Sequence, residues 1–305
     1  HNVHVDAVIF IYDTASTSFI EFQSIPVVGV QDIEVIHFDG RTMLAFAEKK
    51  TNMLKFDPSL ARKYVYPSGG RIGTSSIYER CPITGKFHLF QKLVSNEPTD
   101  FRSFIMNNEQ YLCLSNIHSL TTIAGVTLYK FDSITDQFIE YQRFNSSPDN
   151  LYHTHDVEHA YVNGKNMLFF ARGYDQKETD NSCIYILDET TNYFKRHQTI
   201  VTSSSRDIEA FSIGSRHYLA VANLYVARNE GTKLTHISGP SHDLIDSFIY
   251  EMDPMTGLYK PVQKWQGKSA VKGGKTWLGS PLVGGIHPHG RWVRGAPGPP
   301  PPRGT

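Results

Sequence analysis

The chain has 305 residues, of which 40% are hydrophobic and 20% charged, and its 30 basic and 30 acidic side chains give a formal net charge of zero. This composition is typical of a folded protein with a sizeable core, and a neutral chain lacks the basic excess that nucleic-acid binding requires. No stretch approaches the length of apolar sequence that forms a transmembrane helix. We therefore expect a globular protein with no nucleic-acid partner and no membrane insertion.

Five segments along the chain share one pattern, which predicts a β-hairpin in each. An apolar pair is followed at fixed distances by Asp, by Ser or Thr, by an aromatic residue and by Gln, and Cys81 is the one departure at the Asp position. We expect the Asp to accept backbone N–H bonds in the turn and the aromatic residue to start the returning strand. The segments are IFIYDTASTSFIEFQ from Ile9, IYERCPITGKFHLFQ from Ile77, LYKFDSITDQFIEYQ from Leu128, IYILDETTNYFKRHQ from Ile184 and IYEMDPMTGLYKPVQ from Ile249.

A second hairpin follows each of the first four segments. Its strands are joined by Asp39-Gly40, Asn107-Asn108, Asn163-Gly164 or Gly214-Ser215, which suit tight two-residue turns. The run YLAVAN at residues 218–223 is continuously apolar and predicts a strand covered on both faces. The four hairpins are DIEVIHFDGRTMLAFAEKK from Asp32, DFRSFIMNNEQYLCLSN from Asp100, DVEHAYVNGKNMLFFAR from Asp156 and DIEAFSIGSRHYLAVAN from Asp207.

Two hairpins per unit give a four-stranded sheet, and the unit recurs at a period of about 50 residues with variable loops. We therefore predict an all-β fold, a β-propeller of four-stranded blades, over residues 1–263. The sequence supplies about four and a half such blades. The longest connections, residues 49–75 and 225–246, are expected to project from one rim as recognition surfaces.

Residues 264–305 differ in composition from the repeats. They contain seven Lys/Arg, ten Gly, seven Pro and no acidic residue, whereas residues 1–263 carry a net charge of −7. This composition predicts a disordered basic tail, with a proline-rich ligand segment or an alternatively spliced end as alternatives. Because the chain opens at His1 without Met, we expect a processed chain or a fragment. Closure with fewer blades, or with strands from elsewhere, is the alternative to a fragment of a larger propeller.

The repeat resembles a known family. FxxxQxIxxxxxxDIExFxIGxxxYLAVAN is the signature of the EAR repeat, also called the EPTP (epitempin) repeat, and residues 194–223 match it almost throughout. Residues 19–48 match nearly as well, the units at Phe87 and Phe138 match less closely, and the resemblance covers about residues 6–263. It implies a seven-bladed propeller in extracellular proteins such as the leucine-rich glioma-inactivated proteins and the thrombospondin-type laminin G and EAR repeat proteins. The family binds receptor and adhesion partners and has no known enzymatic chemistry.

Asp32, Asp100, Asp156 and Asp207 each begin the first strand of a blade, which lies innermost in a propeller. The four carboxylates are therefore candidate ligands of a cation, most plainly calcium, in the central channel. The repetition favours a different interpretation, in which each Asp binds neighbouring backbone N–H groups because every blade needs that contact. Paired carboxylates for glycoside hydrolysis are a third interpretation, but catalysis requires two carboxylates in unlike environments.

Three further features have both a functional and a structural interpretation. His153, His155 and His159 share one parity on an unbroken strand, as metal ligands would, but their spacing shows no closed ligand set, so we expect a solvated rim or loop. The three cysteines have no CxxC spacing and are expected to be small buried hydrophobes, with one disulfide plus a free thiol as the alternative. Asn145 begins a glycosylation sequon.

We expect a secreted, non-enzymatic module that binds a cell-surface or extracellular protein of the receptor or adhesion type through its rim loops. No GxSxG, Walker, Rossmann or HExxH motif is present, so no catalytic residue and no cofactor other than the calcium considered above is assigned. The alternative is a propeller enzyme such as a glycoside hydrolase that uses the strand carboxylates.

Overall fold

The computed structural model describes residues 6–49, 72–117, 125–144, 151–173, 181–223, 244–268, 271–272 and 275–276. Every regular element within these residues is a β-strand, which confirms the all-β prediction. A helix of the length and apolarity needed to cross a membrane is not found in this part of the chain.

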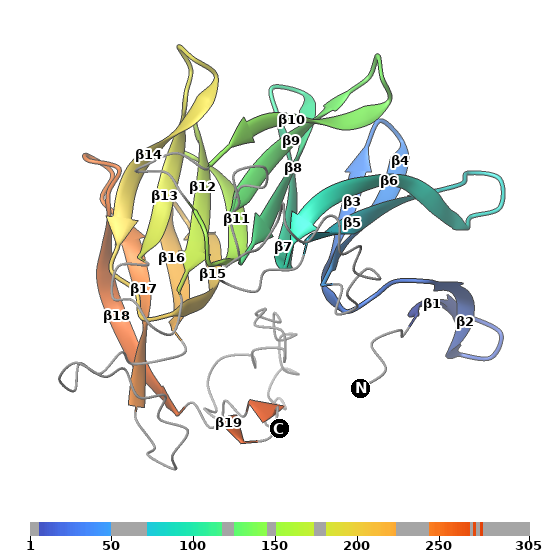
Figure 1. Ribbon diagram of the computed structural model, residues 1–305. Helices are drawn as coiled ribbons and strands as arrows, with labels where there is room; N and C mark the ends of the chain where they lie inside the picture. Colours follow the sequence, from blue (N-terminus) through green and yellow to red (C-terminus); the bar gives the residue numbers. More distant parts are fainter. Residues whose placement is uncertain are drawn as a thin grey trace, which may run out of the picture.

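The described strands include four antiparallel four-stranded sheets, in which strands that follow one another in the sequence are neighbours. We call these sheets blades 1 to 4 in chain order, and they stand side by side in an arc (Figure 1). Blade 1 contains β3 (Val30–Phe38), β4 (Arg41–Glu48), β5 (Ile72–Arg80) and β6 (Phe87–Asn96), and blade 2 contains β7 (Pro98–Met106), β8 (Glu109–Asn116), β9 (Val126–Asp132) and β10 (Gln137–Arg143). Blade 3 contains β11 (Thr154–Val162), β12 (Lys165–Arg172), β13 (Ser182–Asp188) and β14 (Tyr193–Ile200), and blade 4 contains β15 (Ser205–Ile213), β16 (Arg216–Asn223), β17 (Leu244–Met252) and β18 (Tyr259–Lys268).

A two-stranded sheet precedes blade 1. It pairs β1 (Ala7–Asp13) with β2 (Ser18–Ile25) and is built from the first of the five repeat hairpins. The other four hairpins supply the third and fourth strands of blades 1 to 4, so β1 and β2 correspond to the outer half of a blade. The prediction of a β-propeller with about four and a half blades is thereby confirmed.

The inner hairpin of each blade turns at the dipeptide that the sequence predicts. Both residues have positive φ in Asp39-Gly40, Asn107-Asn108 and Asn163-Gly164, whereas in the last hairpin Gly214 alone does. The first three fit a type I′ turn and the last fits a type II′ turn, both of which match the twist of the flanking strands.

The outer hairpins turn on the repeated Asp. Asp132 accepts hydrogen bonds from the backbone N–H groups of Ile134 at 3.3 Å and Thr135 at 3.2 Å. Asp13, Asp188 and Asp253 make contacts of the same kind. Because the Lys195 ammonium and the backbone N–H of Thr190 bind the ionised form, they lower the pKa of Asp188 to about 2.

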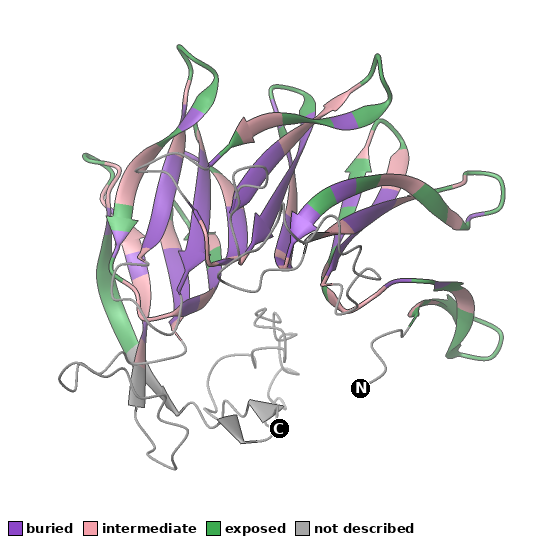
Figure 2. Ribbon diagram, viewed as in Figure 1, coloured by how far each residue is buried: buried purple, intermediate pink, exposed green. Residues whose placement is uncertain are grey.

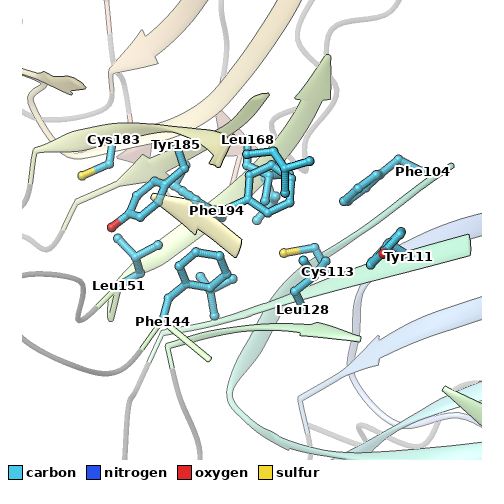
Figure 3. Packing of buried hydrophobic residues seen from close by; sticks show 14 of the residues in the cluster. Phe104, Tyr111, Cys113, Leu128, Phe144, Leu151, Leu168, Cys183, Tyr185 and Phe194 are labelled. Carbon is cyan, nitrogen blue, oxygen red and sulfur yellow. The ribbon is translucent and has the colours of Figure 1, made fainter. Parts of the chain in front are cut away.

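The core lies between neighbouring blades. The largest cluster joins blades 2 and 3 through residues such as Phe104, Leu168 and Phe194 (Figure 3), and similar clusters join blades 1 and 2 and blades 3 and 4. Cys113 and Cys183 are buried in this largest cluster, as expected for small hydrophobes, and burial raises the pKa of the Cys113 thiol well above its usual value. Burying one such phenylalanine contributes roughly 1.5–3 kcal/mol, so the stacking of blades is a main source of stability.

Blade 3 has a complete neighbouring blade on each side, and its second strand packs on both neighbours. In β12, Phe169 and Phe170 are both fully buried, yet Phe169 belongs to the cluster with blade 4 and Phe170 to the cluster with blade 2. Successive side chains of a strand point to opposite faces, which explains this division. Figure 2 shows the buried residues concentrated on these middle strands, and exposed residues on β1 and β2 and on the outer strands. The prediction that YLAVAN is covered on both faces is confirmed by the burial of Leu219 to Ala222.

The innermost strands β3, β7, β11 and β15 contact one another in that order. The structure therefore brings the starts of the four inner hairpins together, although they are more than 50 residues apart in the sequence. At the other end of the chain, β18 extends to Lys268, past the expected start of the tail at residue 264. β19 (Val271–Lys272) and β20 (Lys275–Thr276) form a short pair, and the rest of the expected tail lies outside the described residues.

Candidate functional site

The four candidate channel carboxylates lie on the innermost strands, where neighbouring blades meet. In each of the first three, Oδ2 accepts a hydrogen bond from a backbone N–H group of the next blade. The pairs are Asp32 with Phe101 at 3.1 Å, Asp100 with Val157 at 3.1 Å and Asp156 with Ile208 at 2.9 Å. Asp207 is buried at the same position of blade 4. These contacts agree with the interpretation in which each Asp binds neighbouring backbone and so positions the next blade.

The described residues contain no group of three or more His, Cys, Asp or Glu side chains that is arranged to hold a metal ion. Because an ionised carboxylate has two oxygens with about four acceptor sites, the backbone N–H bond to Oδ2 does not by itself prevent cation binding. Calcium binding by Asp32, Asp100, Asp156 and Asp207 stays a prediction.

In blades 1 and 2, the residue two positions after the repeated Asp also reaches the next blade. Oε1 of Glu34 accepts hydrogen bonds from N and Oγ of Ser103 at 2.8 and 2.9 Å. Blade 2 has Arg102 at this position, and its guanidinium forms an ion pair with Glu158 and donates Nε to the carbonyl oxygen of Val157 at 3.1 Å. Arg102 departs from the repeat signature, but it preserves a polar contact between blades with the charge reversed.

The repeated Gln binds one residue of the neighbouring blade through both ends of its amide. Nε2 of Gln142 donates to the carbonyl oxygen of Phe194 at 2.8 Å, and Oε1 accepts from the N–H of Phe194 at 2.8 Å. The same reciprocal pair occurs for Gln23 with Phe87, Gln91 with Phe138 and Gln198 with Tyr259. A primary amide carries both a donor and an acceptor, which is why this position suits Gln. We call these four contacts the glutamine bridges.

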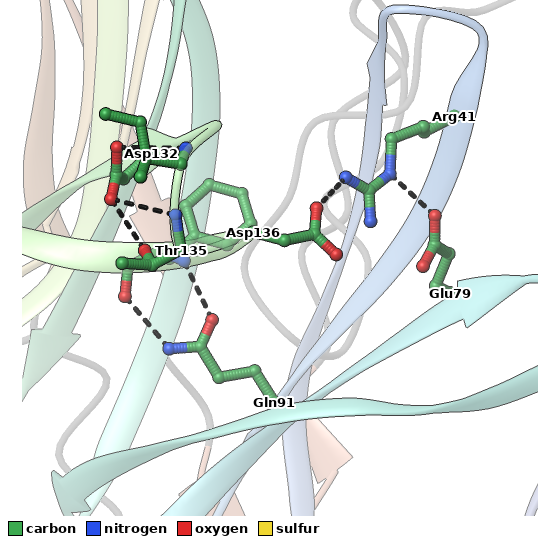
Figure 4. A network of polar contacts seen from close by, with 8 residues as sticks. Arg41, Glu79, Gln91, Asp132, Thr135 and Asp136 are labelled. Carbon is green, nitrogen blue, oxygen red and sulfur yellow. Dashed lines mark hydrogen bonds and ion pairs between the residues drawn. The ribbon is translucent and has the colours of Figure 1, made fainter.

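Arg41 forms a further contact between blades 1 and 2, next to a glutamine bridge (Figure 4). Its Nε lies 2.6 Å from Oε1 of Glu79 on its own blade, and its Nη1 lies 2.5 Å from Oδ1 of Asp136 on the next blade. Its guanidinium lies over three aromatic rings, those of Phe38, Phe90 and Phe131. Sequence reasoning missed Arg41. Its partner Asp136 lies at a turn position where the other four hairpins have no aspartate, so the repeat pattern does not mark it.

The histidines of YHTHDVEHAY do not converge. A bulge in β11 between Thr154 and Asp156 breaks the regular alternation, so the shared parity of an unbroken strand does not hold. Nε2 of His155 lies 2.8 Å from the carbonyl oxygen of Gly173, and the same ring contacts the guanidinium of Arg206. Burial and the Arg206 charge lower the pKa of His155 to about 3.

His159 stacks on Phe104 of blade 2, with ring centroids 4.0 Å apart, and its Nε2 lies 3.2 Å from Oδ1 of Asn166. Burial lowers its pKa to about 4. Our expectation of a solvated rim is therefore wrong for His155 and His159, which are partly buried on a strand between blades.

The outer hairpin turns present a large exposed apolar residue at the same position in three of the five hairpins. Ile83, Ile134 and Met255 are 92%, 92% and 91% exposed. Ala15 and Thr190 hold this position in the other two hairpins. Side chains with this exposure contribute little to the core, and each of the three stands on a separate hairpin turn. We call Ile83, Ile134 and Met255 the apolar tips.

Cys81 replaces the turn Asp in the second hairpin. Its backbone N–H donates to the carbonyl oxygen of Lys86 and its carbonyl oxygen accepts from the N–H of Gly85, both at 2.8 Å. The hydroxyl and N–H of Thr84, with the N–H of Ile83, surround the sulfur and lower the pKa of the thiol. All three cysteines are free in the structure, and the expectation of a buried hydrophobe is wrong for Cys81, which is only half-buried.

Two expectations lie outside the described residues. The sequon residue Asn145 is one, and most of the two long connections, residues 50–71 and 224–243, is the other. The strand ends that they join are described. In an antiparallel sheet, the end of β4 and the start of β5 lie opposite the outer hairpin turn, so these strand ends and the apolar tips lie at opposite rims.

The fold is similar to that of several solved structures. A putative 6-phosphogluconolactonase from Bacteroides uniformis matches with a TM-score of 0.44 and 13% identity over 87% of this chain and 79% of its own. A glycoside hydrolase family 32 beta-fructofuranosidase from Bombyx mori matches with a TM-score of 0.41 and 13% identity over 64% of this chain and 44% of its own.

Two curated relatives are similar in sequence. The thrombospondin-type laminin G domain and EAR repeat-containing protein of Homo sapiens is 30% identical over 142 residues, which is 46% of this chain and 18% of the relative. Its counterpart from Mus musculus is 26% identical over 163 residues, which is 52% of this chain and 23% of the relative. The chain thus spans less than a quarter of the length of these relatives. Residues 194–251 match the family model of the EPTP domain, and with these relatives the match confirms the resemblance to EPTP, or EAR, repeat proteins.

Proposed function

We propose that this chain is a secreted protein-interaction module that docks a receptor- or adhesion-type protein through its rim. The observation that carries the proposal is the EPTP match over residues 194–251 together with the similarity to laminin G and EAR repeat proteins. The internal contacts agree with a binding role, because the repeated polar side chains serve to stack blades. What varies from blade to blade is the surface at the turns.

The apolar tips are the part of the rim on which the described structure allows a test. The hairpin of Ile134 is held by the hydrogen bonds of Asp132, so the tip is presented on an ordered turn. A partner that covers three such tips removes apolar surface from water at little cost in conformational entropy. We propose that Ile83, Ile134 and Met255 contribute to partner binding.

The test is saturable binding of the purified full chain to intact cells, measured by flow cytometry before and after protease treatment of the cell surface. We expect a protease-sensitive signal that falls at least about fivefold when Ile83, Ile134 and Met255 are all changed to Asp. Thr190→Asp is the matched control, since it places the same charge at the same turn position of another hairpin, and it should retain binding. Binding that resists protease, or that falls equally in both proteins, would contradict the proposal.

The backbone hydrogen bonds that Asp32 and Asp156 accept between blades support a structural role for these carboxylates over the hydrolase alternative. A hydrolysis screen on soluble oligosaccharides tests it with Asp32→Asn, Asp156→Asn and Asp207→Asn. We expect no turnover by the unmodified chain. A turnover that these substitutions abolish would overturn the proposal of a module that only binds.

Calcium and glycosylation are separate proposals. If calcium binds at Asp32, Asp100, Asp156 and Asp207, the melting temperature of the full chain should rise with calcium concentration, and Asp100→Asn should reduce that rise. A flat titration removes the calcium site. If the chain passes through the secretory pathway, Asn145 should carry a glycan, which Asn145→Gln should remove as a mass difference.

A further inference from the structure

One side of blade 1 is exposed where the same side of blades 2, 3 and 4 is covered. Ile33 of β3 is 43% exposed, whereas the residues at the same position after the repeated Asp are 0% or 1% exposed. Those residues are Phe101, Val157 and Ile208. Val35 is 48% exposed as well. The difference lies in what precedes each blade, because all four residues follow the same motif.

In blades 2 to 4 the preceding blade provides the cover. Asp32 and Glu34 of blade 1 accept the backbone N–H groups of Phe101 and Ser103, and apolar residues of blade 1 pack on Phe101. What precedes blade 1 is the β1–β2 hairpin, which packs on Phe46 and makes a glutamine bridge through Gln23. This hairpin holds the place of an outer half-blade, and no inner half lies beside it among the described residues.

None of the described strands pairs with the inner edge of β1. Its equivalents β5, β9, β13 and β17 each pair along that edge with the second strand of their blade, whereas β1 pairs only with β2 among the described strands. Phe10 is exposed, although Tyr185 and Tyr250 at the same repeat position are buried. An open edge of this length is a template for pairing with another strand. We call Ile33, Val35 and the inner edge of β1 the leading face.

We propose that the leading face binds a two-stranded antiparallel hairpin of the same repeat type, supplied by a repeat that is not among these 305 residues. Its second strand pairs with β1, as β16 pairs with β17. Its first strand carries an Asp that accepts the N–H of Ile33 and, two residues later, an acceptor for the N–H of Val35. Its apolar residues then cover both side chains. This surface is distinct from the apolar tips, so the inference does not depend on the proposed function.

The contacts between blades favour this occupant over two others. Residues 264–305 contain no acidic side chain, so the chain's own tail has no carboxylate to place opposite Ile33. A second copy of the chain holds each of its described inner hairpins within a complete blade, and it would have to open that blade to donate one. A hairpin of the DIE type fits the acceptor positions without such a cost, because the same interface already forms three times within the chain.

The probe is a synthetic peptide with the sequence of residues 205–223, which forms β15 and β16 in this chain. Its affinity for the full chain is measured by fluorescence anisotropy, and the site by hydrogen exchange. We expect saturable binding with new protection of the amides of β1. Asp207→Ala in the peptide and Val35→Glu in the protein should each weaken binding at least about tenfold, the second because it places two carboxylates opposite each other.

Ile213→Glu in the protein is the matched control. Ile213 is an exposed apolar residue of blade 4 that is not part of the leading face, so its substitution should leave the affinity unchanged. Val35 and Ile213 are both exposed, so neither substitution is expected to disturb folding, which a thermal melt checks. The proposal is overturned if the peptide does not bind, if Val35→Glu binds as tightly as the unmodified chain, or if protection falls on residues 205–223 instead of β1. Self-association without peptide that Val35→Glu abolishes would identify a second copy as the occupant and would also overturn it.

Discussion

Removal of one glutamine bridge should cost more stability than the same substitution at a position without a described partner. Gln142→Ala deletes both hydrogen bonds to Phe194 and leaves the N–H and the carbonyl oxygen of that residue without the amide that binds them. Phe194 is buried in the core between blades 2 and 3. Two net hydrogen bonds at about 1 kcal/mol each, plus the desolvation of the groups left unpaired, predict a loss of about 3 kcal/mol in the free energy of unfolding.

Gln263→Ala is the matched control. Gln263 holds the same repeat position on β18 but is exposed, and none of the described residues binds its amide. We expect a change within about 0.5 kcal/mol. Urea unfolding followed by circular dichroism measures both, with the denaturant slope checked for constancy, and hydrogen exchange at the Phe194 amide reports the bridge locally.

Gln142→Glu separates the hydrogen bonds from side-chain volume. The ionised Glu faces the carbonyl oxygen of Phe194 without a proton to donate, whereas the protonated acid restores both bonds. The folded state therefore raises the pKa of this Glu, and its stabilising contribution is present below the unfolded pKa and is lost as the pH rises through the folded one. Equal losses at Gln142→Ala and Gln263→Ala, or a Gln142→Glu deficit that does not change with pH, would refute this account of the repeated glutamine.

Three further predictions concern titration and reactivity. Asp188 should titrate near its pKa of about 2 in an NMR titration, and Lys195→Met should move the midpoint toward the ordinary 3.8. In that variant, the stability that ionised Asp188 adds above its unfolded pKa is lost at a higher pH than in the unmodified chain. Because the pKa of His155 falls from 6.5 to about 3 on folding, its contribution to stability is complete above pH 6.5 and is lost as the pH falls toward 3. His155→Gln should therefore make the urea midpoint depend less on pH in that range, and an unchanged dependence would contradict the burial argument. In the native chain Cys81 should react with a thiol reagent at neutral pH and Cys113 should react only on unfolding; fast modification of Cys113 would contradict its place in the core.

The features that follow from a few neighbouring residues were predictable from the sequence. Asn163-Gly164 specifies a tight turn because both residues tolerate positive φ, and Asp132 specifies its hairpin because it binds the backbone two and three residues later. The number of blades followed from counting such hairpins. These predictions needed no knowledge of which blade lies next to which.

The contacts between blades were not predictable in the same way, although the sequence marked their positions. The Gln register was plain, but its role depends on a partner about 50 residues away that only blade stacking brings within reach. The prediction that the three histidines point to one side assumed an unbroken strand. The bulge at His155 adds one residue to the strand and changes the direction of the side chain there. Arg102 stands where the motif has Glu, and its ion pair with Glu158 serves the same interface between blades.

The repeat motif therefore describes the junction between two blades rather than one blade. From Phe194 to Asn223 it begins on β14, the last strand of blade 3, and ends on β16, the second strand of blade 4. Its aromatic residue and Gln belong to bridges on the outside, and the N–H of Ile208, the residue after its Asp, is bound by Asp156 of the preceding blade near the axis. A chain that repeats this motif specifies how blades stack and leaves the turn tips and long connections free to differ. Those surfaces can then change while the interfaces that hold the propeller together stay the same.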